Sequence, residues 1–258
     1  MKIYDNNNLL IRWTFGETVA RPTSLQAFDM LSCSISYAKL LFPNAQMAIF
    51  YNSLKSNQSL ERLFEIGRNI EIIESKADFK EYRNKNSFWK YFPLRLDSSK
   101  YELVLDNDII LWNIPSTFLK WIESDGVLLN TDWNGSYYGK FQNQIHTSKN
   151  YNAGIIGYPP NYNFQLPDFS NIHELFHSEQ GFIVKTFLDS GKEVYAIEKE
   201  EIYQSNNLES KLDSKELFDK FSGGHFCGCS FCHYFDWDKY YKDKIWNEYF
   251  RLCNTWKL

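Results

Sequence analysis

The sequence predicts a single α/β domain with a mixed, mostly parallel sheet flanked by helices. Residues 9–15, 46–51 and 70–74 are short apolar runs that we expect to form strands, and helical patterns separate them. This β-α-β-α-β alternation requires crossover connections, which place helices on the faces of a parallel sheet. The length of 258 residues and the hydrophobic content of 43% are sufficient for one domain with a substantial core.

The first helix is predicted over residues 25–42, with Ser24 as its N-cap and Pro43 closing it. Its apolar residues recur at helical spacing: Leu25, Phe28, Leu31, Ile35 and Ala38. Further helices are expected over 59–67, most of 78–96, 114–123, 177–190 and 239–253, and further strands over 101–105, 127–132, 153–158 and 193–202. The segments 133–152 and 222–233 are predicted to be loops, which in compact domains often carry function.

The amino-acid composition limits the possible binding partners and the cellular compartment of the protein. The net charge of −4 provides no global basic field, so nucleic acid is disfavoured as a partner. No basic segment precedes an apolar one near Met1, and no window approaches about 18 apolar residues, so we expect neither a signal peptide nor a transmembrane segment. The five cysteines are odd in number and partly clustered, which favours a reducing compartment. We therefore expect a cytoplasmic protein, with attachment to the periphery of a membrane left open.

Two carboxylates interrupt the most apolar stretch of the chain. Asp106 and Asp108 follow the predicted strand that begins at Tyr101, and Ile109 and Ile110 resume the apolar run after them. A carboxylate in apolar surroundings must be paired, hydrogen-bonded or bound to a metal. An Asp-x-Asp metal site and a simple Asp-Asn-Asp turn both explain the pattern. In either case the pair lies at the carboxyl end of a strand, the edge at which open α/β sheets bind ligands.

Four further motifs accompany Asp106-x-Asp108 along the chain. They are Phe88-Trp-Lys-Tyr-Phe-Pro-Leu-Arg-Leu96, Tyr151-Asn-Ala-Gly-Ile-Ile-Gly157, His177-Ser-Glu-Gln-Gly181 and Gly223-Gly-His-Phe-Cys-Gly228. In this order and spacing the set resembles the GT-A glycosyltransferases, the nucleotide-diphospho-sugar transferases. The resemblance implies one GT-A (Rossmann-like) domain over residues 1–258, with a nucleotide-binding half of about 1–112 and an acceptor-binding half of about 113–258.

The resemblance also implies a metal-dependent reaction. Asp106 and Asp108 match the metal motif, whose hard carboxylate oxygens suit Mn²⁺ or Mg²⁺. His225 matches a third ligand, although the Lys-Pro-Trp that often follows in retaining relatives is replaced here by residues 230–237. Cys227, Cys229, Cys232 and His233 are also of zinc-ligand type, but their spacing is too tight for the usual structural zinc shell.

Contacts to the donor are implied for two cationic residues and one small-residue turn. Lys90 and Arg95 could neutralise a diphosphate, or could instead be a surface residue and a partner in a structural ion pair. Asn152 and Gly154 could approach the donor sugar, or simply form a tight turn.

Two acids are candidates for catalysis. Glu179 matches an acid that faces the acceptor or the donor sugar, although the helix dipole also explains an acid at that position. Asp132, at the end of the predicted 127–132 strand, is the second candidate.

The expected donor is a nucleotide-diphosphate sugar, a UDP-sugar first among them, and the acceptor is a glycan, lipid-linked or protein hydroxyl. Two alternatives remain. A sugar-nucleotide nucleotidyltransferase would normally carry a Gly-rich, basic loop after the first strand, and residues 16–22 hold one Gly and one Arg. A non-catalytic carbohydrate-binding module would account for the aromatic content of 18%.

Overall fold

The computed structural model describes residues 3–16, 23–52, 54, 56–76, 88–133, 135–168, 178–205, 212–227 and 236–256. The strands are β1 (Leu9–Gly16), β2 (Gln46–Asn52), β3 (Glu71–Glu74), β4 (Tyr101–Asp106), β5 (Ile109–Leu111), β6 (Val127–Thr131), β7 (Tyr151–Tyr158), β8 (Val194–Ile197), β9 (Ile202–Gln204) and β10 (Gly223–His225). The α-helices are α1 (Leu25–Leu41), α2 (Asn57–Ile66), α3 (Ser116–Trp121), α4 (Ser178–Asp189), α5 (Ser214–Lys220), α6 (Trp237–Tyr240) and α7 (Lys242–Trp256), and the 3₁₀ helices are η1 (Phe88–Tyr91) and η2 (Gly139–Gln144).

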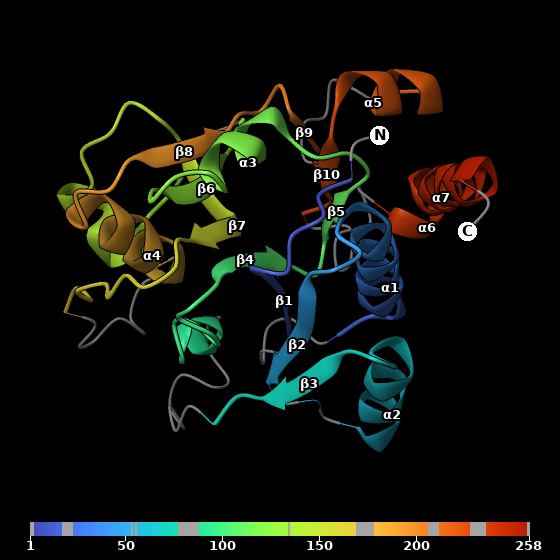
Figure 1. Cartoon of the computed structure of the whole chain (residues 1–258), viewed down its shortest axis with the longest axis horizontal. Coiled ribbons are helices and arrows are strands. Elements are labelled where there is room, and N and C mark those ends of the chain that lie inside the picture. The colour runs from blue at the N-terminus through green and yellow to red at the C-terminus, as the bar shows by residue number, and fades with distance from the viewer. Residues whose placement is uncertain are drawn as a thin grey trace.

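The described strands form one large and one small sheet, whose arrangement is visible in Figure 1. The large sheet has the order β3-β2-β1-β4-β7-β6-β8, and only β7 runs against its neighbours. The small sheet has the order β5-β10-β9. The predicted fold class, a mixed and mostly parallel sheet flanked by helices, is confirmed.

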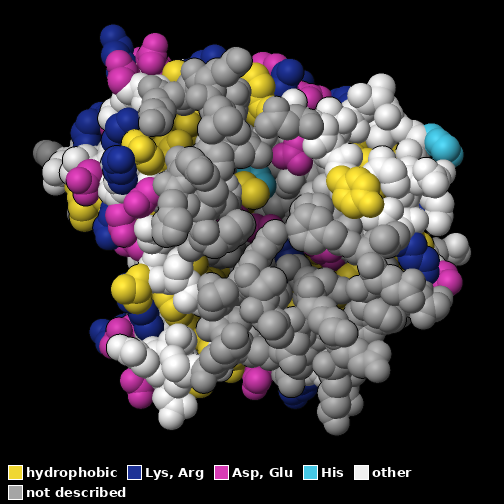
Figure 2. All heavy atoms as spheres, turned by 180° about the vertical axis from the view of Figure 1, so that it is seen from behind, with side chains coloured by type: hydrophobic (Ala, Val, Ile, Leu, Met, Phe, Trp, Pro, Cys, Tyr) yellow, Lys and Arg dark blue, Asp and Glu magenta, His cyan; other side chains and the backbone are white. Residues whose placement is uncertain are grey.

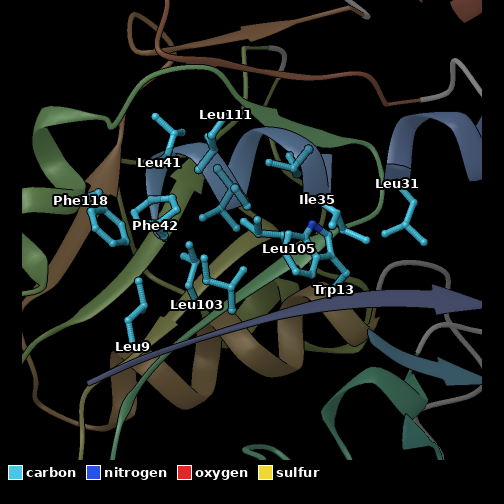
Figure 3. Packing of buried hydrophobic residues seen from close by; sticks show 14 of the residues in the cluster. Leu9, Trp13, Leu31, Ile35, Leu41, Phe42, Leu103, Leu105, Leu111 and Phe118 are labelled. Atoms are coloured by element: carbon cyan, nitrogen blue, oxygen red, sulfur yellow. The ribbon is translucent and has the colours of Figure 1, made fainter. Parts of the chain in front are cut away.

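Alternation along β1 divides the core into two layers. Leu9, Ile11, Trp13 and Phe15 face α1, and Figure 3 shows Leu9 near Leu103 and Trp13 near Leu105 and Ile35. Arg12 and Thr14 point to the opposite face, because successive side chains of a strand alternate. That second face is covered by η1, η2 and α4, whose buried residues pack with Val104, Leu129 and Ile156.

Helix α1 forms where its sequence pattern predicts it. Ser24 accepts a hydrogen bond from the Ala27 N–H at 3.2 Å, as an N-cap should. Phe28 and Leu31 are buried under β1, whereas Leu25 is 68% exposed although it shares the predicted apolar spacing. The first turn of α1 thus extends past the part of the sheet that the helix covers.

The C-terminal helices close over the other side of α1. Asp29 of α1 accepts hydrogen bonds from the indole N–H groups of Trp237 at 2.6 Å and Trp246 at 3.4 Å. The Tyr37 hydroxyl donates to the Ile245 carbonyl at 2.8 Å. The resulting third core cluster joins α1, the small sheet and α5 to α7. None of the described helices is both long and apolar enough to cross a membrane.

Three sequence-based expectations require correction. In the described part of the predicted 78–96 helix, residues 88–91 form the 3₁₀ helix η1 and residues 92–96 are not helical, since Pro93 disfavours the helical conformation for the preceding residue. Residues 78–87 lie outside the described residues. The segment 193–202 splits into β8 and β9, which belong to different sheets. The segment 222–233, predicted as a loop, contains strand β10. A Cβ at Gly223 would lie 2.7 Å from the Ile110 carbonyl oxygen, so glycine permits this close pairing with β5.

Candidate active site

Asp106 ends β4 at the carboxyl edge of the parallel strands, as predicted. Its carboxylate accepts a hydrogen bond from the Thr14 hydroxyl at 2.9 Å. The Lys90 ammonium donates to both of its oxygens, at 2.7 and 3.0 Å. The side chains of Lys90 and Asp106 are 14% and 26% exposed, so the pair is accessible to a ligand from one side.

Lys90 reaches Asp106 because η1 lies on the face of the sheet to which Thr14 and Asp106 point. Phe88 and Tyr91, which flank Lys90, are buried against Phe182 of α4 with ring centroids 5.0 and 6.0 Å apart. This aromatic packing anchors the short helix and directs the lysine toward the strand end. Thr14 was not predicted as a site residue, although the alternation along β1 places its side chain on this face.

Asp108 and His225 face each other beside Asp106. The β4–β5 turn carries Asp108, and β10 pairs with β5 so that His225 lies opposite Ile109. The Phe226 N–H donates to the Asp108 carbonyl at 2.8 Å and fixes the register of the turn. The His225 Nε2 lies 3.7 Å from the Asp108 Oδ1, and within the described residues that buried oxygen has no hydrogen-bond donor.

The charges of this pair depend on each other. Burial raises the pKa of Asp108, while the nearby His225 lowers it and Asp106 raises it. Burial acts to lower the pKa of His225, but its hydrogen bond with Cys227 and the carboxylates of Asp108 and Asp132 raise that pKa to about 10. The imidazole therefore lies within electrostatic reach of one acid that follows β4 and one that follows β6.

The Asn152–Gly154 turn lies against the same histidine. The Asn152 side chain donates to the Asp132 carboxylate at 2.8 Å and accepts from the Gly154 N–H at 2.7 Å. A Cβ at Gly154 would lie 3.2 Å from the His225 Cε1 and 3.0 Å from the Asn152 Oδ1. Glycine thus permits the imidazole and the Asn152 side chain to pack closely against the β7 backbone. The structure brings Asp106, Asp108, Asp132, Asn152, Gly154 and His225 to one edge of the sheet.

Glu179 lies in the first turn of α4 and is partly exposed. Helix α4 packs closely against the backbone at Tyr138, because a Cβ at Gly181 would be only 2.1 Å from the Tyr138 carbonyl oxygen. Burial raises the pKa of Tyr91, and the carboxylates of Asp106 and Glu179 add to that rise, so both acids lie near one phenol. Residue 177, the predicted helix start, is outside the described residues.

Figure 2 shows a face of the molecule on which histidine, acidic and basic side chains lie near one another at the centre. Gly228, Cys229, Cys232 and His233, part of the predicted loop, are among the residues that the structure does not describe.

Arg95 is a correction to the predicted site. Its guanidinium donates to the backbone carbonyls of Asp97, Lys100 and Pro159 at 2.5 to 3.1 Å. These groups lie at the start of β4, and a six-residue strand at about 3.3 Å per residue puts Asp106 roughly 17 Å away. A cation used in this way cannot also hold a diphosphate at the other end of the strand.

A buried arginine, Arg12, also holds this part of the chain. Arg12 pairs with Glu102 at 3.0 Å, and both side chains are 0% exposed. Arg12 also donates to the Pro93 and Leu94 carbonyls at 3.1 and 2.9 Å, and Glu102 accepts from the Leu96 N–H at 2.7 Å. The pair therefore holds the segment that follows η1 against the sheet. Alternation places Arg12 on the face of Thr14, which is the only sequence signal of this role.

The Arg95→Met variant tests the corrected placement. We expect the free energy of unfolding to fall by roughly 2–3 kcal/mol, since several charge-assisted hydrogen bonds to backbone carbonyls are lost. The affinity for a nucleoside diphosphate should stay unchanged, because no part of Arg95 lies near Asp106. Chemical denaturation and nucleotide titration measure the two quantities. A loss of nucleotide affinity with unchanged stability would restore Arg95 to the site.

The side chains fit a divalent cation in part. Across the described ranges, no three His, Cys, Asp or Glu side chains are grouped closely enough to hold a metal ion by themselves. Asp108 offers a buried oxygen without a donor, and His225 faces it, whereas Asp106 is engaged by Lys90. Mg²⁺-type ions are commonly held by one or two carboxylates together with substrate phosphates and water. An incomplete protein shell of this kind is therefore compatible with an ion that arrives with a diphosphate.

Comparison with solved structures identifies the fold. The glycosyltransferase GlyE of Streptococcus pneumoniae TIGR4 is similar with a TM-score of 0.50 and 11% identity, and the match covers 95% of this chain and 62% of that one. The galactosyltransferase LgtC, in complex with donor and acceptor sugar analogs, is similar with a TM-score of 0.49 and 11% identity, covering 93% and 95% of the two chains.

The fold is thus of the GT-A type found in glycosyltransferases, and the chain spans less than two thirds of the length of GlyE. No family model and no curated protein matches the sequence. At this level of identity the likeness concerns the fold alone, so activity must be argued from the site.

Proposed function

We propose that the protein is a glycosyltransferase that moves a sugar from a nucleotide-diphosphate sugar to an acceptor hydroxyl with the help of Mn²⁺ or Mg²⁺. The observation that carries the proposal is the facing pair Asp108 and His225, beside Asp106, at the carboxyl edge of β4. This is the ligand-binding edge of an open α/β sheet. A buried carboxylate oxygen without a hydrogen-bond donor is costly unless something binds it.

Asp108 and His225 would hold the cation, and Asp106 would join them or contact it through the bound donor. When bound, such an ion neutralises the charge that develops on the diphosphate leaving group. Lys90 adds a fixed positive charge 2.7 Å from Asp106 and can contact a phosphate oxygen from there. Its three N–H groups allow it to keep a bond to Asp106 while it donates to the ligand.

Asp132, Asn152 and Glu179 would orient the reacting groups. Asp132 and Asn152 form one hydrogen-bonded unit beside His225 and suit contacts with sugar hydroxyls. Glu179 lies in the first turn of α4. An inverting reaction would need one of these two carboxylates as a general base for the acceptor hydroxyl. Gly154 would allow the imidazole of His225 to pack close to the Asn152 turn.

A thermal-shift panel with UDP, GDP and CDP, each with and without Mn²⁺, tests the proposal. We expect UDP to stabilise the protein only when Mn²⁺ is present. At a ligand concentration of about one hundred times Kd the gain is about 2.7 kcal/mol, which corresponds to a rise in Tm of roughly 5–10 °C for a chain of this size.

Hydrolysis of a UDP-sugar in the presence of Mn²⁺ is the accompanying activity measurement. Stabilisation by GDP or CDP instead of UDP would assign a different donor base, and the proposed reaction class would stay the same. No response to any nucleotide, with or without metal, would contradict the proposal. In that case binding of oligosaccharides without nucleotide would favour the carbohydrate-binding module instead.

A further inference from the structure

Gln204 makes two hydrogen bonds to the backbone on either side of Asp132. Its Nε2 donates to the Thr131 carbonyl at 2.7 Å, and its Oε1 accepts from the Trp133 N–H at 3.0 Å. The Gln204 side chain is only 2% exposed. The orientation of the amide is unambiguous, because a carbonyl can only accept and a peptide N–H can only donate.

Gln204 belongs to the strand next to His225. Strand β9 pairs with β10 in parallel, and Gln204 is the register partner of His225. The Ser205 N–H, one residue further, donates to the His225 carbonyl at 3.1 Å. Thr131 is the last residue of β6 in the large sheet. The amide therefore connects the small sheet to the large one. It bonds the Thr131 carbonyl and the Trp133 N–H as the backbone of a neighbouring strand would do.

The two elements that Gln204 connects carry opposite sides of the candidate site. Asp132 and its partner Asn152 come from the large sheet, and His225 comes from the small one. The Asp108 turn ties the sheets together at one side of the imidazole. Without a second connection at the other side, the 131–133 backbone could shift relative to β10.

We propose that Gln204 is a positioning residue, which sets the distance between the Asp132 carboxylate and the His225 imidazole by bridging the two sheets. This role rests on the proposed glycosyltransferase function. Gln204 is buried and its amide is bonded to backbone groups, so it would act through Asp132 and not on donor or acceptor directly. The geometry agrees with this placement: Asn152 donates to Asp132 at 2.8 Å, and Asn152 and His225 both pack against Gly154.

The test uses Gln204→Met, which keeps the length of the side chain and removes both hydrogen bonds. We expect kcat to fall about 10- to 100-fold, because small displacements of catalytic groups have effects of that size, while the donor KM changes by less than about threefold. Gln204→Asn, one methylene shorter, keeps a polar amide but cannot span both groups. Gln204→Asn should show the same fall in kcat with little change in KM. The same result in two variants would mean that a folding defect of Gln204→Met does not cause the effect.

Tyr37→Phe is the matched control. It removes one buried hydrogen bond to a distant backbone carbonyl, that of Ile245, in a region away from the site. Its stability should fall while kcat and KM stay at the wild-type values. If both Gln204 variants keep the wild-type kcat, or if they lose rate only in proportion to unfolded protein, the positioning role is refuted.

A second readout needs no activity. In NMR spectra, the Trp133 amide should exchange faster and the His225 ring resonances should move in Gln204→Met but not in Tyr37→Phe. If the wild type proves inactive, the glycosyltransferase proposal is refuted. The NMR spectra still test whether Gln204 positions His225 and Trp133. Unchanged His225 resonances in both Gln204 variants would overturn the inference whatever the enzyme does.

Discussion

Asp108→Asn should abolish Mn²⁺-dependent transfer or donor hydrolysis while leaving the metal-free protein as stable as the wild type. The substitution keeps the shape of the side chain and removes its charge. Stabilisation by a bound cation is worth several kcal/mol, and about 1.4 kcal/mol corresponds to a tenfold change in rate. We therefore expect turnover to fall by about 10³-fold.

The surroundings of Asp108 explain why the metal-free Asp108→Asn variant should be as stable as the wild type. Its buried Oδ1 has no donor among the described residues, and burial and Asp106 raise its pKa more than the facing His225 lowers it, so the charge is unfavourable on balance in the metal-free fold. Removing it should leave Tm unchanged or raise it. Loss of function without loss of stability is the expected signature of a residue retained for binding.

Asp189→Asn is the matched control, since Asp189 forms a surface ion pair with Lys185 at 2.8 Å, far from the strand edge. It should alter neither rate nor stability by a measurable amount. The Asp106→Ala, Asp108→Ala double variant extends the test to the whole motif. Retention of Mn²⁺-dependent activity in that double variant would refute the metal site.

Local patterns in the sequence were sufficient for the large sheet and its ligand-binding edge. The Ser24 cap and the spacing of Phe28 and Leu31 encode α1 by themselves, because helix periodicity and capping are local. The position of Asp106 at the end of β4 likewise follows from a buried run that stops at an acid. These features depend on residues that are close in the chain.

The parts that the sequence could not predict depend on pairings between distant segments. Strand β10 consists of Gly223, Gly224 and His225, which have no intrinsic preference for a strand and pair only because β5 and β9 flank them. Whether Arg95 binds a ligand or backbone carbonyls is decided by where the chain turns after η1. The use of Gln204 as a bridge has the same origin.

Arg12→Met should be the most destabilising single change in the sheet. It leaves the Glu102 carboxylate, 0% exposed, without its cation. Breaking one side of a buried ion pair costs about 3–5 kcal/mol, because the remaining charge is unpaired in a low dielectric. At roughly 2–4 °C per kcal/mol for chains of this size, Tm should fall by about 10 °C.

The double variant Arg12→Met, Glu102→Gln separates charge from packing. Neutralising the carboxylate should recover most of the lost stability, since the glutamine oxygen can still accept from the Leu96 N–H. Activity should not recover with it. Arg12 also holds the Pro93 and Leu94 carbonyls, and this segment continues from η1, which carries Lys90 to Asp106.

Denaturant melts and donor turnover measured on the single and double variants decide between the two roles of Arg12. Lys185→Met, which breaks a surface ion pair, provides the control and should cost less than about 1 kcal/mol. A double variant that regains both stability and rate would mean that Lys90 is placed by the aromatic packing of Phe88 and Tyr91 alone. Recovered stability with a persistent loss of rate would mean that the buried pair, through the backbone after η1, also sets the position of the cation beside Asp106.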